Sequence, residues 1–297
     1  MGEGTEDLDG EPAVTGPPLP LGRRIDLPGR GRTFFREVEG PPGAPTLLLL
    51  HGWIASAGLN WFQTYEALGR HFHIVAPDLR GHGRGIRARR RFRLADCADD
   101  AAALLDELDI GPVIAVGYSM GGPVSQLLWK RHPDKVRGLV LCATGHSFVK
   151  GGRERYVFTS AMATLAATTR LGQLAAHVPS RQVQRLVPSP SDRSRPGSLQ
   201  RWAAAEMRRH DPRVLLEAGH AIGHYDAGGW IGDIDVPTTV LVTTEDHAIQ
   251  PATQLSMARA IPGSEIHLTK AGHVLCARPE FAPPLVDACG AVAERVH

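Results

Sequence analysis

Short apolar runs that alternate with helical patterns constrain the fold of this 297-residue chain. The runs show no alternation of polar and apolar residues, which is typical of strands buried on both faces of a parallel sheet. They are Thr46–Leu50, His73–Pro77, Val113–Val116, Gly138–Ala143, Thr238–Thr243 and Glu265–Leu268. The helical patterns between and after them are Leu94–Leu108, Val124–His132, Thr253–Ile261 and Phe281–Val296. Strands joined through helices need right-handed crossovers, so the pattern predicts a three-layer α/β fold.

Three regions depart from this alternation. Residues 1–21, rich in Gly and Pro, are expected to form a flexible tail, and the alternating segments Arg23–Leu27 and Thr33–Val38 predict an antiparallel hairpin. Residues 150–232 hold no convincing buried strand, only helical character at Tyr156–Ala176, Leu199–Arg209 and Arg213–His224. We therefore expect a core formed by residues 22–149 and 233–297, with residues 150–232 inserted as a helical cap.

The strongest chemical signal is Gly117-Tyr118-Ser119-Met120-Gly121, which follows an apolar run and precedes a helical pattern. A serine on a very sharp strand-to-helix turn has a strained backbone and an exposed hydroxyl. Side chains two positions before and after it would collide with the neighbouring elements, and glycine at 117 and 121 removes those clashes. Ser119 is therefore the predicted nucleophile.

A serine hydroxyl needs an imidazole to take its proton and a carboxylate to orient that imidazole. His273 follows the run Glu265–Leu268, and Asp246 follows Thr238–Thr243, so both are expected at the ends of late strands. Glu245, beside Asp246, stays open as an alternative acid. Other histidines fit the role of base less well because of their positions before a loop, at or within strands, or at a helix end: His51, His71, His73, His132 and His267.

Acyl transfer also needs two backbone N–H groups that point at the oxygen on which charge develops. The residue after the nucleophile, Met120, is expected to supply one. Trp53, in the loop His51-Gly52-Trp53 after an early strand, is expected to supply the other, because Gly52 lets the backbone approach. The Trp53 side chain is then expected to be available to line a substrate pocket, and His51 to be a structural hydrogen-bonding residue.

These motifs resemble those of the α/β-hydrolase superfamily. The matching residues are the His51-Gly52-Trp53 loop, the segment Asp78–Gly83, the Gly117–Gly122 turn, Asp246 and Gly272-His273. The order Ser119, Asp246, His273 is that of the family. The resemblance implies an eight-stranded, mostly parallel sheet with a helical cap. It departs from the family at Gly85, where relatives usually carry a small hydroxylated residue.

A serine nucleophile argues against the dehalogenases and epoxide hydrolases of this superfamily, which use aspartate. It predicts hydrolysis of a carboxylic ester, lactone or thioester of a small-to-medium apolar acyl group through an acyl-enzyme, with no metal or organic cofactor. A cofactor-free perhydrolase and a C–C bond hydrolase, which could use the same residues, stay open as alternatives. A non-catalytic ligand-binding receptor on the same fold is a further alternative, because fold alone does not fix function.

Charge and composition limit the partners. The 33 Lys and Arg residues nearly balance 31 Asp and Glu residues, which argues against nucleic acid as a partner. No membrane span and no secretion signal is evident, so we expect a cytoplasmic protein with a small-molecule substrate. A basic run, Arg84–Arg93, is interpreted as a solvated loop or as a rim that attracts anions. His220 and His224, with Glu217 and Asp226 nearby, could hold a metal but are interpreted as ordinary helix residues. The oligomeric state stays open.

Overall fold

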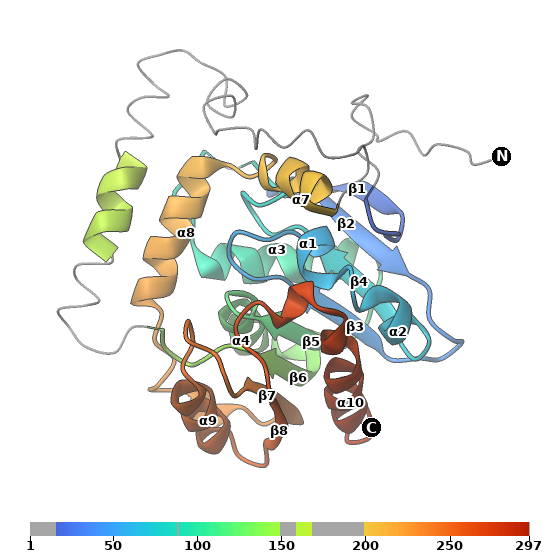
Figure 1. The fold of residues 1–297 in the computed structure, drawn as a ribbon. Coiled ribbons are helices and arrows are strands. Elements are labelled where there is room, and N and C mark those ends of the chain that lie inside the picture. Colours follow the sequence, from blue (N-terminus) through green and yellow to red (C-terminus); the bar gives the residue numbers. More distant parts are fainter. Residues whose placement is uncertain (1–15, 88, 149–158, 168–198, 297) are drawn as a thin grey trace.

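A twisted sheet of eight strands runs through the molecule (Figure 1). The computed structural model describes residues 16–87, 89–148, 159–167 and 199–296. The strand order is β1-β2-β4-β3-β5-β6-β7-β8, in which β1 and β2 form the expected hairpin, β2 pairs antiparallel with β4, and the other neighbours are parallel. The predicted eight-stranded, mostly parallel sheet is confirmed. The strands are β1 (Gly22–Leu27), β2 (Gly31–Val38), β3 (Thr46–Leu50), β4 (His73–Pro77), β5 (Val113–Tyr118), β6 (Val136–Cys142), β7 (Thr238–Thr243) and β8 (Glu265–Thr269).

Helices cover both faces of the sheet, because successive side chains of a buried strand point to opposite sides. Leu48 and Leu50 of β3 pack in one core layer, and Leu47 and Leu49 pack in the other. The first layer includes α3 (Leu94–Glu107), α4 (Gly121–Arg131) and α9 (Pro251–Ala260); the second includes α1 (Ala57–Trp61), α2 (Tyr65–Gly69) and α10 (Ala282–Ala293). Short 3₁₀ turns occur at Pro133–Lys135, Ile231–Asp233, Leu275–Ala277 and Pro279–Phe281.

Strand β8 differs from the expectation of burial on both faces. Ile266 is 40% exposed and Leu268 is 64% exposed. The strand is the last in the sheet order and pairs only with β7, so one of its edges has no neighbouring strand. The apolar run identified the strand correctly, but it did not reveal that the strand lies at the border of the sheet.

The segment expected to form the cap contains two well-defined helices, α7 (Leu199–Met207) and α8 (Pro212–His224), close to the predicted bounds. Asp211 caps α8 by accepting hydrogen bonds from the N–H groups of Arg213 and Val214. Helix α7 contacts α1 and α8 contacts α3, along one side of the layers (Figure 1). Residues 159–167 are helical, and the remainder of the predicted helix at 156–176 lies outside the described residues, as do 177–198.

The start of the chain contributes more structure than a flexible tail would. Residues 1–15 lie outside the described residues. Leu19 packs against the second core layer, and the Pro20 carbonyl accepts a hydrogen bond of 2.5 Å from the Arg36 guanidinium. Leu19 and Pro20 therefore contact the folded core. Within the described ranges, none of the helices combines the length and the apolar character needed to cross a bilayer.

Candidate active site

Ser119 lies on the turn between β5 and α4 with φ at 50°, in the left-handed region that residues other than glycine rarely adopt. A Cβ at Gly117 would lie 2.3 Å from the Gly121 carbonyl oxygen, and a Cβ at Gly121 would lie 1.9 Å from that of Leu50. Both distances are far below van der Waals contact, so the two glycines are required for the turn. The Thr144 hydroxyl donates a 2.7 Å hydrogen bond to the Ser119 carbonyl and fixes the strained peptide.

A chain of hydrogen bonds leads from Ser119 through His273 to Asp246. The Asp246 carboxylate accepts from His273 Nδ1 at 2.8 Å, which leaves His273 Nε2 as the acceptor for the Ser119 hydroxyl at 3.0 Å. Ser119 follows β5, Asp246 follows β7 and His273 follows β8. The structure brings all three predicted residues together. Glu245, the alternative acid, is exposed and pairs with Lys270 at 3.8 Å instead.

Asp246 is held from several directions. Its Oδ1 accepts hydrogen bonds of 2.8 Å from the N–H groups of Ala248 and Ile249, and its Oδ2 accepts one of 2.9 Å from the Thr243 hydroxyl. Burial alone would raise the pKa of Asp246, but the hydrogen bonds from His273, Ile249 and Thr243 outweigh burial and hold that pKa below its usual value. Asp246 is therefore a fixed carboxylate.

Gln254 on α9 supports this arrangement and was not predicted from the sequence. Its amide nitrogen donates to the Ile249 carbonyl at 2.7 Å and to the Thr243 hydroxyl at 2.9 Å, while its oxygen accepts from the Thr243 N–H at 3.0 Å. It thus ties the end of β7 to the loop that carries Asp246. Nothing in a single glutamine on a helix signals this role before the loop is folded.

The two predicted oxyanion donors belong to the turn of Ser119 and to the loop after β3. A Cβ at Gly52 would lie 3.4 Å from that of Ser119, so the loop after β3 comes close to the nucleophile. The Gly52 N–H is occupied by Asn60 Oδ1 at 2.9 Å. By contrast, the N–H groups of Trp53 and Met120 donate to no acceptor within the described part of the chain. Asn60, a residue of α1 that the sequence did not single out, thereby fixes the peptide between His51 and Gly52.

The Trp53 side chain is anchored by a contact that the sequence did not predict. Its indole N–H donates a 2.9 Å hydrogen bond to the Leu215 carbonyl of α8, 162 residues away in the sequence. That this side chain lines a substrate pocket stays a prediction. Helix α8, which the sequence placed in the cap, supplies an acceptor that no local pattern reveals.

His51 has the structural role expected for it. Its Nδ1–H donates to the Gly52 carbonyl at 2.8 Å, and its Nε2 accepts from the Leu79 N–H at 2.9 Å. Burial lowers the pKa of His51 to about 3, and the hydrogen bond to Gly52 offsets only part of that effect. His51 is therefore a neutral clamp between two loops at the sheet edge.

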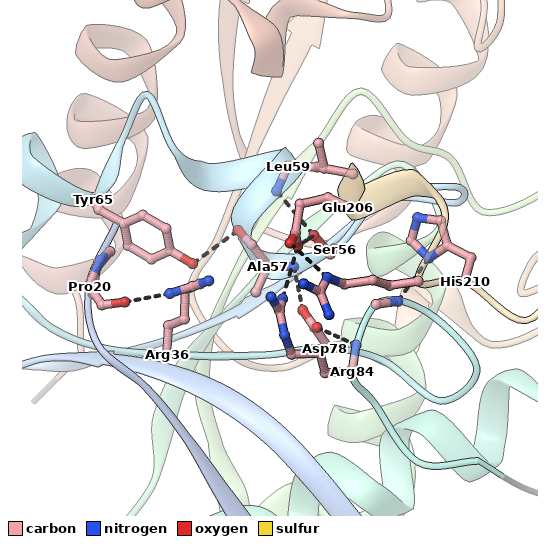
Figure 2. Close-up of polar contacts among 12 residues, drawn as sticks. Pro20, Arg36, Ser56, Ala57, Leu59, Tyr65, Asp78, Arg84, Glu206 and His210 are labelled. Carbon is pink, nitrogen blue, oxygen red and sulfur yellow. Dashed lines mark hydrogen bonds and ion pairs between the residues drawn. The ribbon is translucent and has the colours of Figure 1, made fainter. Parts of the chain in front are cut away.

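A buried polar network joins α7 to two loops, one at Ser56 and Ala57 and the other at Asp78 and Arg84 (Figure 2). Glu206 of α7 accepts from the Arg84 guanidinium at 3.0 Å and lies 3.5 Å from the Ser56 hydroxyl. Asp78 accepts hydrogen bonds of 2.8 Å from the Ala57 N–H and 2.7 Å from the Arg84 N–H. The network fixes the turn that follows the Trp53 loop.

The basic run Arg84–Arg93 therefore differs from a simple solvated loop. The Arg84 side chain is only 8% exposed, and the Arg87 guanidinium donates to the carbonyls of Gly81, Gly83 and Arg209. Arg89, Arg90, Arg91 and Arg93 are exposed. The first part of the run binds the core to α7, and only the later part is a solvated basic surface.

The His220 and His224 rings are tilted by 44° to each other, with centroids 4.3 Å apart. His220 Nδ1 bonds the Thr159 carbonyl, and the Glu217 carboxylate accepts from the Phe92 N–H at 2.8 Å. In the described ranges, no group of three or more His, Cys, Asp or Glu residues is placed to hold a metal ion.

The fold agrees with comparisons to known proteins. The alpha/beta hydrolase fold family matches residues 45–277. The chain belongs to that family. It is 29% identical over 276 residues to a poly(3-hydroxyalkanoate) depolymerase of Ectopseudomonas oleovorans, covering 89% of this chain and 90% of the relative. A thermophilic esterase structure from Thermogutta terrifontis superimposes with a TM-score of 0.71 at 24% identity, over 93% of this chain and 99% of that one, which supports the fold.

Other relatives match only through a part of their length. The acetyltransferase component of an acetoin cleaving system from Pseudomonas putida is 35% identical over 125 residues, which are 42% of this chain and 33% of that protein. A match over a third of the relative's length indicates a shared structural module, and it is not evidence of a shared reaction. The relatives matched over most of their length are named hydrolases and esterases, so the hydrolase class of this chain is shown.

Proposed function

We propose that this protein hydrolyses a carboxylic ester, lactone or thioester with a small-to-medium apolar acyl group, through an acyl-enzyme on Ser119. The observation that carries the proposal is the unbroken hydrogen-bonded chain from Ser119 through His273 to Asp246, with contacts of 3.0 and 2.8 Å. Asp246 holds the His273 Nδ1–H, so the imidazole presents Nε2 as a base toward the serine.

In the first step His273 Nε2 takes the Ser119 proton as the serine oxygen attacks the ester carbonyl. The N–H groups of Trp53 and Met120 donate to the oxygen that becomes negative, and the start of α4 adds to the positive potential there. Collapse of the tetrahedral intermediate expels the alcohol, which takes the proton from His273. Water then attacks the acyl carbon while His273 takes its proton. The bond to the Ser119 oxygen breaks, the serine takes that proton back from His273, and the carboxylic acid leaves.

Two features support an apolar acyl group. Ile54 and Val274 directly follow Trp53 and His273, and their side chains are 37% and 63% exposed. Apolar side chains thus flank the loops of both proposed catalytic groups, where an acyl chain would pack favourably. The name of the depolymerase relative, which refers to an aliphatic polyester, agrees with this class of substrate. We also propose that residues 150–232 cover this site as a cap, on the grounds that α7 and α8 contact the loops around it.

The test is hydrolysis of p-nitrophenyl esters of increasing acyl length, with covalent capture by a fluorophosphonate. Ser119→Ala should lower kcat/KM by about 1,000-fold or more and abolish capture. Ser256→Ala, on the exposed side of α9, is the matched control and should behave as the unmodified protein. If the unmodified protein neither hydrolyses any ester of the series nor forms the adduct, the proposed function is wrong.

A further inference from the structure

Helix α8 packs directly against the Trp53 ring. Leu215, whose carbonyl accepts the indole N–H at 2.9 Å, and Gly219 are four residues apart and lie on the same face of the helix. A Cβ at Gly219 would lie 2.7 Å from Trp53 Cζ2 and 3.0 Å from Cη2. Only glycine therefore lets the six-membered ring of the indole lie directly on the helix backbone.

The helix is in turn fixed to the core on the side away from Trp53. The Asp211 N–H, just before α8, donates to the Gly81 carbonyl at 2.9 Å, and Glu217 accepts from the Phe92 N–H at 2.8 Å. A Cβ at Gly81 would lie 2.1 Å from a Val214 methyl carbon, so helix and loop are in close contact there. Helix α8 thus forms a rigid support against which Trp53 rests.

The residue that rests there, Trp53, is also the one whose backbone N–H is the proposed oxyanion donor, in a loop that comes close to Ser119 at Gly52. The peptide that carries the Trp53 N–H has its carbonyl, that of Gly52, held by His51 Nδ1 at 2.8 Å. The next residue, Ile54, has φ at 58°, a strained value for a β-branched side chain. Backbone strain of this kind persists only where neighbouring contacts hold it. The ring of Trp53 against α8 is such a contact.

We propose that Gly219, together with the Leu215 carbonyl, positions the Trp53 N–H for the oxyanion, so that α8 is a working part of the oxyanion hole. The inference rests on the proposed function and adds a positioning residue to it. A displacement of the indole turns the peptide that carries the donor, and misplacement of a catalytic donor by a fraction of an ångström lowers the rate of the chemical step.

The test is Gly219→Ala, with Gly290→Ala as the matched control. Gly290 lies inside α10 with nothing within 4 Å of an added Cβ, so this control makes the same change in a helix without a clash. Gly219→Ala should lower kcat and the rate of fluorophosphonate capture by about tenfold, with KM changed less than about twofold. Gly290→Ala should leave all three unchanged.

A double-mutant cycle separates positioning from a general effect on folding. Phenylalanine at position 53 does not reach as far as the indole atoms Cζ2 and Cη2, so the added methyl group finds room. Trp53→Phe should itself lower kcat because it removes the indole N–H, but in that background Gly219→Ala should cost less than about threefold. Two results would overturn the inference if the unmodified protein still forms the adduct. The first is that Gly219→Ala lowers kcat equally in the unmodified and the Trp53→Phe backgrounds. The second is that the Gly219→Ala protein is as active as the Gly290→Ala protein. Absence of that adduct would overturn the proposed function, and this inference with it.

Discussion

Three buried histidines lie in a row beside the proposed site, and they predict a steep loss of stability in acid. Ring centroids are 5.4 Å apart for His51 and His82, and 5.6 Å apart for His82 and His210. Burial, with a smaller contribution from neighbouring positive charge, lowers the pKa of each to about 3. His210, which follows α7, accepts a 2.8 Å hydrogen bond from the Gly83 N–H at Nδ1, so protonation there would break a contact between α7 and the core.

The sign of the effect follows from proton linkage. Each folded-state pKa lies below the unfolded value of about 6.5, so the unfolded chain binds more protons throughout the window between about pH 6.5 and pH 3. Stability is unaffected above that window and falls as the pH is lowered through it. At about pH 5 each histidine lowers the free energy of unfolding by about 2 kcal/mol relative to neutral pH. The three together contribute at most about 6 kcal/mol, because adjacent sites titrate as a coupled group.

Urea unfolding at a series of pH values between about 5 and 8 measures this effect as the slope of the unfolding free energy against pH. His210→Asn should reduce the slope below pH 6 by about 1 kcal/mol per pH unit, whatever its effect on stability at neutral pH. Ser256→Ala, which changes no titratable group, is the control and should keep the slope of the unmodified protein. Other groups that titrate in this range cancel in the comparison. Equal slopes for the two variants would refute the assignment of acid sensitivity to the buried row.

Two further predictions concern the supports of the site. Gln254→Ala leaves the Thr243 N–H without its partner and loosens the Asp246 loop, so kcat should fall by about tenfold in ester hydrolysis, whereas Gln250→Ala at an exposed position should not change it. Glu206→Ala removes the carboxylate that forms a buried ion pair with Arg84 and should lower the free energy of unfolding by about 3 kcal/mol in urea titrations. The exposed pair of Glu66 and Arg70 offers a control, for which Glu66→Ala should cost less than about 1 kcal/mol.

The sequence was sufficient for features that depend on local patterns. Strands β3 to β8 were predictable because their apolar runs are short and bounded, and β1 and β2 because their residues alternate. The turn at Ser119 was predictable because only glycine fits at 117 and 121. Helices α1 and α2 were not predicted, since five residues are too few to show a helical period. The exposure of β8 was missed for another reason: the position of a strand in the sheet order is a property of the whole fold.

The residues that support the candidate site also depend on the whole fold and not on local patterns. Asn60 acts across eight residues, Gln254 across eleven, Glu206 across 122 and Leu215 across 162, and none of the four stands in a recognisable motif. Two of these contacts come from α7 and α8, in the segment least constrained by the family pattern. If the oxyanion donor depends on α8, then changes in that segment alter the rate of the chemical step as well as the shape of the pocket. Substrate preference should therefore follow the relatives that share this segment, and not those that match only through the core strands.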